Sequence, residues 1–237
     1  MNILFVIQQI DFADHIALSY LSAVAKQRNH NTYFCSLRSN NIIELVKTIR
    51  PEVIAYSANI MGFNELVEVN KQLKKIHKFT SILGGPQATF SPETFSESGM
   101  DAYCIGEGEL PFRDFLIRLE KNEEYDDIEN IITSKKINPV RNLIGNLDEI
   151  PIPDRDLVLS NSWLKNIPKK TFYTTRGCPF SCSYCCNSYY HELYKGKGVI
   201  FRRFPVERII REMQYVKERY KMDFVKIGDD LFSLKAD

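Results

Sequence analysis

The sequence predicts an α/β fold in which a doubly wound, mostly parallel sheet is followed by a second, shorter βα unit. In the first 130 residues, apolar runs of strand length alternate with amphipathic segments of helical length. This alternation is typical of a parallel sheet with helices on both faces. After a proline-containing connector at 150–154, a second strand-and-helix pattern begins near residue 170. The two patterns indicate two structural units.

Within the first unit, strands and helices are expected to follow one another in order. The opening run 2–7 is almost entirely apolar, as expected for a strand that is buried on both faces of a sheet. Ile16, Leu18 and Leu21 then recur near helical spacing, and the second helix is expected to stop before Pro51. The first part of this unit is therefore predicted to contain strands at 2–7, 31–37 and 52–57 and helices at 13–27 and 42–49.

The second part of this unit repeats the alternation. Asn64 is expected to cap a long amphipathic helix, because its side chain can accept a hydrogen bond from the first helical turn. The next strand ends in Gly84-Gly85-Pro86, and the strand after it ends in a run of alternating glycine and glutamate at 106–109. These patterns predict strands at 80–83 and 101–105 and helices at 65–77 and 110–120.

From about residue 125 the pattern changes to a short hairpin, expected at 128–133 and 136–141, and a proline-containing connector. The second unit then has a strand, a loop with four cysteines, a helix that begins at Pro205, and another strand. Its strands are expected at 170–175 and 223–228 and its helix at 205–220. The expected domain limits are 1–141 for the first unit, 142–169 for a linker and 170–237 for the second unit.

The loops that follow the predicted strands indicate where a ligand would bind. In an open parallel sheet, ligands bind in the crevice outside the carboxyl ends of the strands. Residues 8–14, 57–62, 84–89 and 106–109 all follow strands of the first unit. The sequence therefore predicts one crevice lined by four loops.

The composition is that of an ordinary globular protein. Apolar residues make up 44% and charged residues 26% of the 237 residues, and the net charge of +1 favours neither nucleic acid nor an anionic membrane. No uninterrupted apolar stretch reaches about 18 residues, so no membrane span is expected. The six cysteines do not resemble a secreted disulfide framework, and a reducing cytoplasm is the expected location.

The most informative motif is the cysteine loop, in which Cys178, Cys182 and Cys185 have the spacing C-x-x-x-C-x-x-C. Clusters used only for electron transfer usually have a thiolate on every corner iron, whereas three thiolates leave one iron open to a small molecule. The motif therefore predicts a 4Fe–4S cluster that does chemistry on a ligand. A zinc site is the alternative, with Cys186 or His191 as a fourth ligand, although no second two-ligand knuckle occurs.

The run at 174–185 resembles the signature of the radical S-adenosylmethionine superfamily. The resemblance implies that Cys178, Cys182 and Cys185 hold a 4Fe–4S cluster whose open iron chelates S-adenosylmethionine, which one electron cleaves to give a 5′-deoxyadenosyl radical. It also implies that Tyr184 lies beside the adenine. Asp229 and Asp230, at a strand end of the implied barrel, are expected to contact S-adenosylmethionine or substrate, with solvated turn acids as the alternative.

The first unit resembles the cobalamin-binding domain that precedes many of these enzymes, on the runs 83–89, 91–93 and 101–109. The runs 150–155, 201–205 and 228–232 also resemble that subgroup. The resemblance implies a Rossmann-like, flavodoxin-like domain followed by the start of a partial (βα)6 radical S-adenosylmethionine barrel. The histidine-ligand pattern Asp-x-His-x-x-Gly is absent, since the loop at 9–15 has His15 directly after Asp14. Bound cobalamin is therefore expected to lack a histidine ligand.

Five residues at strand ends are the expected cobalamin contacts. Gly84 and Gly85 would let the backbone approach a bulky ligand closely, with a plain turn as the alternative. Ser57 would hydrogen-bond the nucleotide tail of cobalamin, unless it is only a solvated strand-end serine. Gly106 and Glu107 are the remaining candidates. For Glu107 and Glu109 the first interpretation is that they are helix N-terminal acids that the helix dipole favours, with a cofactor role as the alternative.

The resemblance implies an enzyme that transfers a methyl group to an unactivated carbon of a small molecule or peptide, with rearrangement or ring formation as other outcomes. An electron donor such as flavodoxin or ferredoxin is the implied partner. Roughly 60 residues follow Cys178, enough for two strands and a helix, so an N-terminal fragment of a longer enzyme is expected. The alternatives are a cobalamin-binding module, a catalytically incomplete fragment and a zinc-stabilised α/β regulator.

Overall fold

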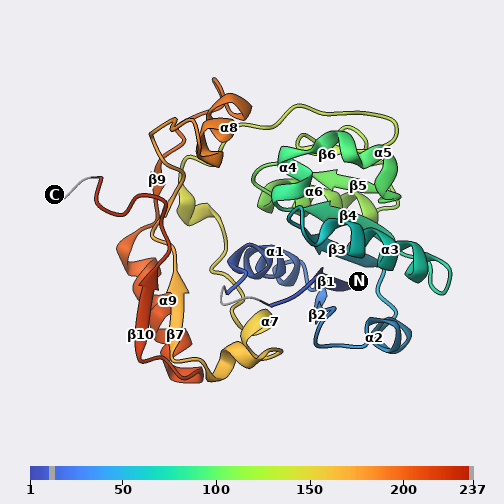
Figure 1. Cartoon of the computed structure of the whole chain (residues 1–237), viewed down its shortest axis with the longest axis horizontal. Helices are drawn as coiled ribbons and strands as arrows, with labels where there is room; N and C mark the ends of the chain where they lie inside the picture. Colours follow the sequence, from blue (N-terminus) through green and yellow to red (C-terminus); the bar gives the residue numbers. More distant parts are fainter. Residues whose placement is uncertain (11–13, 235–237) are drawn as a thin grey trace.

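The computed structural model describes residues 1–10 and 14–234, and Figure 1 shows a large sheet with its helices beside a smaller C-terminal unit. The large sheet has six strands in the order β2-β1-β3-β4-β5-β6. The first five are parallel, and the short β6 runs antiparallel to β5. The strands are β1 (Asn2–Ile7), β2 (Asn31–Ser36), β3 (Val53–Ser57), β4 (Thr80–Gly84), β5 (Ala102–Cys104) and β6 (Ile131–Ile132). The predicted α/β fold class is confirmed.

Helices cover both faces of this sheet because alternate strand residues point to opposite faces. In β1, Phe5 packs on one face with α1 (Ile16–Lys26) and α6 (Glu109–Glu120). Leu4 packs on the other face with the remaining helices of this unit. These are α2 (Ile42–Ile49), α3 (Phe63–Lys74) and the short α4 (Pro86–Phe90), with the 3₁₀ turn η1 (Pro92–Thr94) and α5 (Phe95–Ser98) following α4.

The strand order creates a switch point at the carboxyl edge of the sheet. The chain passes from β1 to β2 on one side and then returns to β3 on the other side of β1. At such a switch the crossover helices leave to opposite faces, which opens a crevice at the strand ends. Strands β1, β3, β4 and β5 end at this edge, so the loops that follow them start there.

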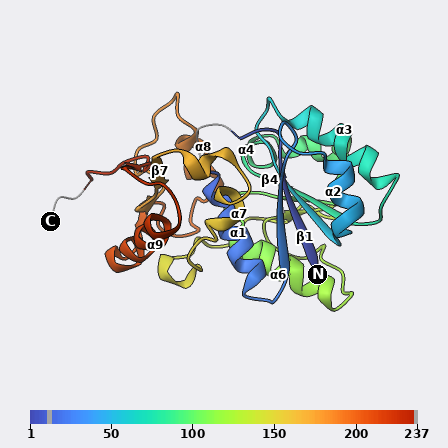
Figure 2. The ribbon, with the colours of Figure 1, turned by 90° about the horizontal axis from the view of Figure 1, so that it is seen from below.

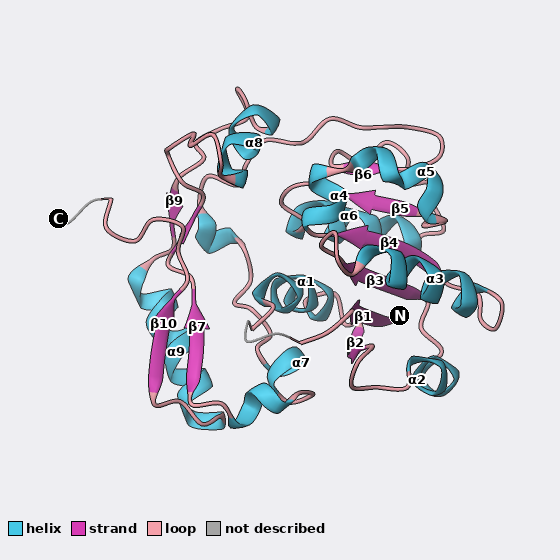
Figure 3. Ribbon diagram, viewed as in Figure 1, coloured by secondary structure: helices cyan, strands magenta, loops and turns pink. Residues whose placement is uncertain are grey.

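The C-terminal unit contains two small two-stranded sheets. Figure 3 shows β7 (Lys169–Phe172) and β10 (Phe224–Ile227) side by side, and these strands are parallel. The other pair, β8 (Thr175–Arg176) and β9 (Arg202–Arg203), is antiparallel. This unit also contains α8 (Cys186–Leu193) and α9 (Val206–Arg219), and the segment between the two units contains η2 (Leu147–Glu149), α7 (Asp156–Leu159) and η3 (Trp163–Asn166).

Three local predictions are wrong. Asn64 lies inside α3, which follows Gly62 and has no side-chain cap, because Asn59 accepts the backbone hydrogen bonds of this turn instead. The single strand expected at 170–175 is two strands, since the backbone N–H of Thr174 donates to Asp229 and pairing changes from β10 to β9. The expected hairpin is reduced to β6 and one bridge between Ile132 and Ile137.

The two units share one hydrophobic core. Phe5 of β1, Leu157 of α7, Phe172 of β7 and Val216 of α9 belong to the same buried cluster. Figure 2 shows α1 between the large sheet and the C-terminal unit, where it contacts α7. Within residues 1–10 and 14–234, no helix is long and apolar enough to cross a membrane.

Candidate functional site

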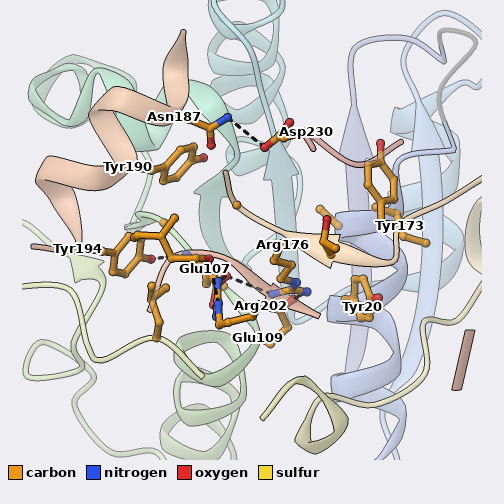
Figure 4. A pocket seen from close by; sticks show the side chains of 18 of the residues that line it. Tyr20, Glu107, Glu109, Tyr173, Arg176, Asn187, Tyr190, Tyr194, Arg202 and Asp230 are labelled. Atoms are coloured by element: carbon orange, nitrogen blue, oxygen red, sulfur yellow. Dashed lines mark hydrogen bonds and ion pairs between the residues drawn. The ribbon is translucent and has the colours of Figure 1, made fainter. Parts of the chain in front are cut away.

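Two adjoining cavities lie at the carboxyl edge of the large sheet. The first, of about 330 Å³, lies between the two units and is drawn in Figure 4. The second, of about 250 Å³, lies over the ends of β3, β4 and β5. Both are lined by Gly106, Glu109 and Tyr190, so the two cavities meet at the start of α6. A ligand larger than either cavity could therefore span both.

The second cavity contains four of the five residues expected to contact cobalamin: Ser57, Gly84, Gly85 and Gly106. Gly85 has a φ of 84°, and a Cβ there would lie 2.8 Å from the Ser57 Oγ. Gly106 has a φ of 70°, and a Cβ there would lie 1.9 Å from the Tyr194 Oη. Neither position has room for a side chain, so glycine lets Ser57 and Tyr194 pack directly against the backbone at these strand ends.

The uncharged part of the second cavity wall includes Cys104 and Tyr190. Burial raises the pKa of the Cys104 thiol to about 12 and the pKa of the Tyr190 hydroxyl to about 12, so both groups stay neutral at ordinary pH. Cys104 is therefore a wall of the cavity rather than a reactive nucleophile.

Ion pairs join the loop after β5 to the C-terminal unit. The Glu107 carboxylate binds the guanidinium of Arg202, with Oε2 and Nη1 3.0 Å apart. Glu109 begins α6 and pairs with Arg176. Burial alone would raise the pKa of Glu109, but the neighbouring Arg176 outweighs this effect and lowers the pKa. Glu109 is thus a helix N-terminal acid, which is one of the two roles expected from the sequence. It is also the ion-pair partner of Arg176 at the first cavity.

Aromatic rings complete this charged wall. The Arg176 guanidinium carbon lies 5.0 Å from the centre of the Tyr20 ring and 5.7 Å from that of Phe204. The backbone N–H of Glu107 donates to the Tyr194 Oη over 2.7 Å. Arg176, Arg202 and Tyr194 were not predicted as site residues, although Arg176 and Arg202 stand in motifs that the sequence analysis singled out.

The cysteine loop supplies three free thiols for a metal site. Cys178 and Cys185 are half-buried and Cys182 is exposed. Cys185 directly precedes α8, and its backbone N–H donates to the Cys182 carbonyl over 3.0 Å.

The donor chemistry of this loop allows a three-thiolate cluster. The His191 ring donates through Nε2 to the Cys178 backbone carbonyl over 2.8 Å, so that nitrogen is not free as a fourth ligand in this conformation. Among residues 1–10 and 14–234, no three His, Cys, Asp or Glu side chains are gathered closely enough to hold one metal ion, and this includes Cys178, Cys182 and Cys185. Three thiols on one loop match a cluster with one open iron.

The remaining predicted site residues have different surroundings. Tyr184 is 91% exposed, directly before Cys185. The Asp229 carboxylate accepts the backbone N–H groups of Thr174 and Thr175, over 2.7 and 3.2 Å, and so holds the junction of β7 and β8. Asp230 lines the first cavity and accepts a hydrogen bond from Asn187 over 3.1 Å. Only Asp230 of these three residues lines a cavity.

Helix α8 connects the cysteine loop to the sheet of the first unit. Tyr189 and Tyr190 pack edge-on against Phe90 of α4, with ring centres 5.1 and 5.4 Å apart. At the end of the helix, Tyr194 closes against Gly106. This short helix therefore directly follows a predicted cluster ligand, and its Tyr190 lines both cavities.

Comparisons with known proteins agree with this arrangement. Residues 12–116 match the model of the B12 binding domain. The chain is 30% identical to the uncharacterized methyltransferase PH0819 of Pyrococcus horikoshii, over 92% of this chain and 49% of the relative. It is 28% identical to the cobalamin-dependent radical SAM methyltransferase TokK of Streptomyces tokunonensis, over 78% of this chain and 28% of the relative.

A solved structure has the same fold over nearly the whole chain. TsrM from Kitasatospora setae, a radical S-adenosylmethionine methyltransferase solved with cobalamin and a [4Fe-4S] cluster, superposes with a TM-score of 0.72 at 13% identity. The match covers 98% of this chain and 48% of TsrM. The chain spans at most about half the length of these relatives. Its first unit thus matches the B12 binding domain, and over most of its length the chain is similar to methyltransferases, among them a cobalamin-dependent radical SAM methyltransferase.

Proposed function

We propose that this chain binds a 4Fe–4S cluster through Cys178, Cys182 and Cys185, with S-adenosylmethionine at the open iron and cobalamin in the adjoining cavities. The reaction that this arrangement best supports is methyl transfer to an unactivated carbon of a small molecule or peptide. The observation that carries the proposal is the position of α8, which joins the cysteine loop directly to the cavity over the strand ends. Two cofactors bound in these places would be neighbours.

The residues around the second cavity support cobalamin as its ligand. Gly84, Gly85 and Gly106 line this cavity with backbone alone, and Ser57 offers a hydroxyl at the end of β3. The proposed cobalamin has no histidine ligand. Part of the loop where that ligand would lie, Asp11, Phe12 and Ala13, is outside the described residues, and the described His15 directly precedes α1.

The residues of the C-terminal unit support S-adenosylmethionine near the cluster. Asp230 faces the first cavity beside Asn187, and Tyr184 stands next to the third cysteine with its ring exposed to an incoming ligand. Asp229 is proposed to act through the strand junction that it holds. When bound, the cluster would supply the electron that cleaves S-adenosylmethionine, and cobalamin would carry the methyl group. An external donor such as flavodoxin or ferredoxin would supply that electron.

The proposed domain limits follow the same division of labour. Residues 1–141 would hold cobalamin, 142–169 would link the units, and 170–237 would begin the barrel that holds the cluster. Because the units share a core, we expect them to keep a fixed relative position.

The test is anaerobic reconstitution of the whole chain with iron, sulfide and cobalamin, followed by dithionite and S-adenosylmethionine. The proposal predicts bound cobalamin, close to four irons per chain, and 5′-deoxyadenosine or another cleavage product of S-adenosylmethionine. Cobalamin binding without a cluster would instead identify a cobalamin-binding module. Recovery of one zinc ion in place of iron would overturn the proposal in favour of a zinc-stabilised regulator.

A further inference from the structure

We infer that Asn187 is a positioning residue for the predicted cluster. Its side-chain amide donates a hydrogen bond to the sulfur of Cys185, and Asp230 fixes the orientation of that amide. This inference rests on the proposed function, because it assumes that Cys185 ligates iron. It goes further by giving a residue outside the cysteine motif a defined effect on the cluster.

Asn187 stands out by its burial. It is 5% exposed, and it is the one buried residue of α8, a helix whose other side chains are exposed or half-buried. Burying an amide group costs free energy unless its polar atoms have hydrogen-bond partners. The buried amide therefore points to a specific set of partners on the side of α8 that faces the cavity.

The partners of this amide explain its orientation. The Nδ2 atom lies 3.1 Å from Asp230 Oδ2 and 3.6 Å from Cys185 Sγ, and Figure 4 shows the first of these contacts. An amide nitrogen carries two hydrogens, so it can serve both acceptors at once. A carboxylate and a thiolate only accept hydrogen bonds, so turning the amide over would place its oxygen against two acceptors. Asp230 therefore holds the N–H groups toward the sulfur.

A hydrogen bond to a ligand sulfur has a measurable consequence. Donors to the sulfurs are among the features that set the reduction potential of an iron–sulfur cluster, because they offset the negative charge that reduction adds. Removing the Asn187 donor should therefore make the cluster harder to reduce. The competing explanation is that the contact between Asn187 and Asp230 only braces α8 against the end of β10, which would affect stability but not potential.

The matched pair of variants is Asn187→Leu and Ser188→Ala. Leucine is similar in size to asparagine but has no donor. Ser188 is the next residue, and its hydroxyl also contacts Cys185, but it donates to the backbone carbonyl, over 2.7 Å, rather than to the sulfur. Both substitutions thus remove a hydrogen bond to Cys185, but only Asn187→Leu removes one that the sulfur accepts.

The measurement is the midpoint potential of the reconstituted cluster, followed by electron paramagnetic resonance without S-adenosylmethionine, together with iron content and thermal unfolding. We expect Asn187→Leu to lower the equilibrium constant for reduction at least threefold, about 28 mV for a one-electron couple, and Ser188→Ala to leave it unchanged. If Asn187→Leu instead loads less iron while Ser188→Ala loads normally and both unfold at similar temperatures, the positioning role is also supported.

Two results would overturn the inference. One is an Asn187→Leu protein with normal iron content and the wild-type potential, which would leave Asn187 as a brace between α8 and β10. The other is an equal change in both variants. A wild-type chain that takes up no cluster would overturn the proposed function, and the inference with it. Either of the two results above, obtained with a cluster present in the wild-type chain, would overturn the inference alone.

Discussion

Arg155 provides the strongest test of how the two units are joined. It is 1% exposed, and its guanidinium binds Asp14 over 2.7 Å and Glu212 over 3.0 Å, so it connects the loop before α1 to α9. The side chains of both acids are only 3% exposed. Arg155→Met would leave two buried carboxylates without their cation, and breaking such a buried pair costs about 3–5 kcal/mol. This is a large share of the roughly 5–15 kcal/mol by which a native protein is stable.

The assay is equilibrium unfolding in urea, followed by circular dichroism. With a slope of about 2 kcal/mol/M, a loss of about 4 kcal/mol lowers the midpoint by about 2 M. Arg38→Met is the matched control, because Arg38 is 58% exposed in its pair with Glu65, and such surface pairs contribute about 0–1 kcal/mol. The reasoning is refuted if the two variants lose the same stability.

The pH dependence of Arg155→Met gives a second check on the same network. Burial is the main effect that raises the pKa of Glu212, even with Arg155 nearby. A carboxyl group with a raised folded-state pKa is most favourable to folding below its unfolded pKa, and that contribution is lost as the pH rises through the folded pKa. The loss of unfolding free energy caused by Arg155→Met should therefore become smaller as the pH falls from 8 to 5.

Three further predictions concern the site. Gly106→Ala places a Cβ 1.9 Å from Tyr194 Oη at a φ of 70°, so it should lower the stability of the fold by at least about 1–3 kcal/mol and weaken cobalamin binding. Gly145→Ala, whose Cβ would meet nothing within 4 Å, should change neither property. Thermal unfolding would measure the stability, and absorbance would measure the bound cobalamin. Cys182→Ala should lose the iron–sulfur absorbance and iron content, while Cys186→Ala, at the neighbouring exposed thiol, should keep them. Glu109→Gln should be destabilised at pH 7 by about 3 kcal/mol in urea unfolding. Since the pKa of Glu109 is lowered, this deficit is present above about pH 4.3, the ordinary carboxyl value, and disappears as the pH falls through the folded pKa.

Each of these predictions has an outcome that contradicts it. Equal stability and cobalamin affinity of Gly106→Ala and Gly145→Ala would mean that α8 and Tyr194 move away from residue 106 with no loss of free energy. Loss of iron in Cys186→Ala would add that cysteine to the ligand set. A deficit of Glu109→Gln that stays constant from pH 7 to pH 3.5 would mean that the ion pair with Arg176 is not its cause.

The sheet could be predicted from sequence because its strands are buried on both faces and its helices are amphipathic. Leu4 and Phe5 pack on opposite faces of β1, so the strand appears as a continuous apolar run. Helix α8 could not be predicted in this way, because Asn187 is its one buried residue and it has no apolar stripe. Its position depends on contacts with Phe90 and Gly106, which local sequence does not reveal.

The candidate site shows the same division. The cysteine spacing and the strand-end glycines are local patterns, and they could be found without a structure. Arg176, Arg202 and Tyr194 contact partners 67, 95 and 87 residues away, and no local pattern connects them to Glu109 and Glu107. The loops of the site can therefore be found from local sequence, whereas the ion pairs that join its two halves cannot.

The central claim is that Cys178, Cys182 and Cys185 hold a 4Fe–4S cluster with one iron open to S-adenosylmethionine. The most direct measurement is the electron paramagnetic resonance spectrum of the anaerobically reconstituted, dithionite-reduced chain, with and without S-adenosylmethionine. We expect a 4Fe–4S signal that shifts when S-adenosylmethionine is added. A cluster signal that S-adenosylmethionine leaves unchanged, or a chain that binds zinc and no cluster, would contradict it.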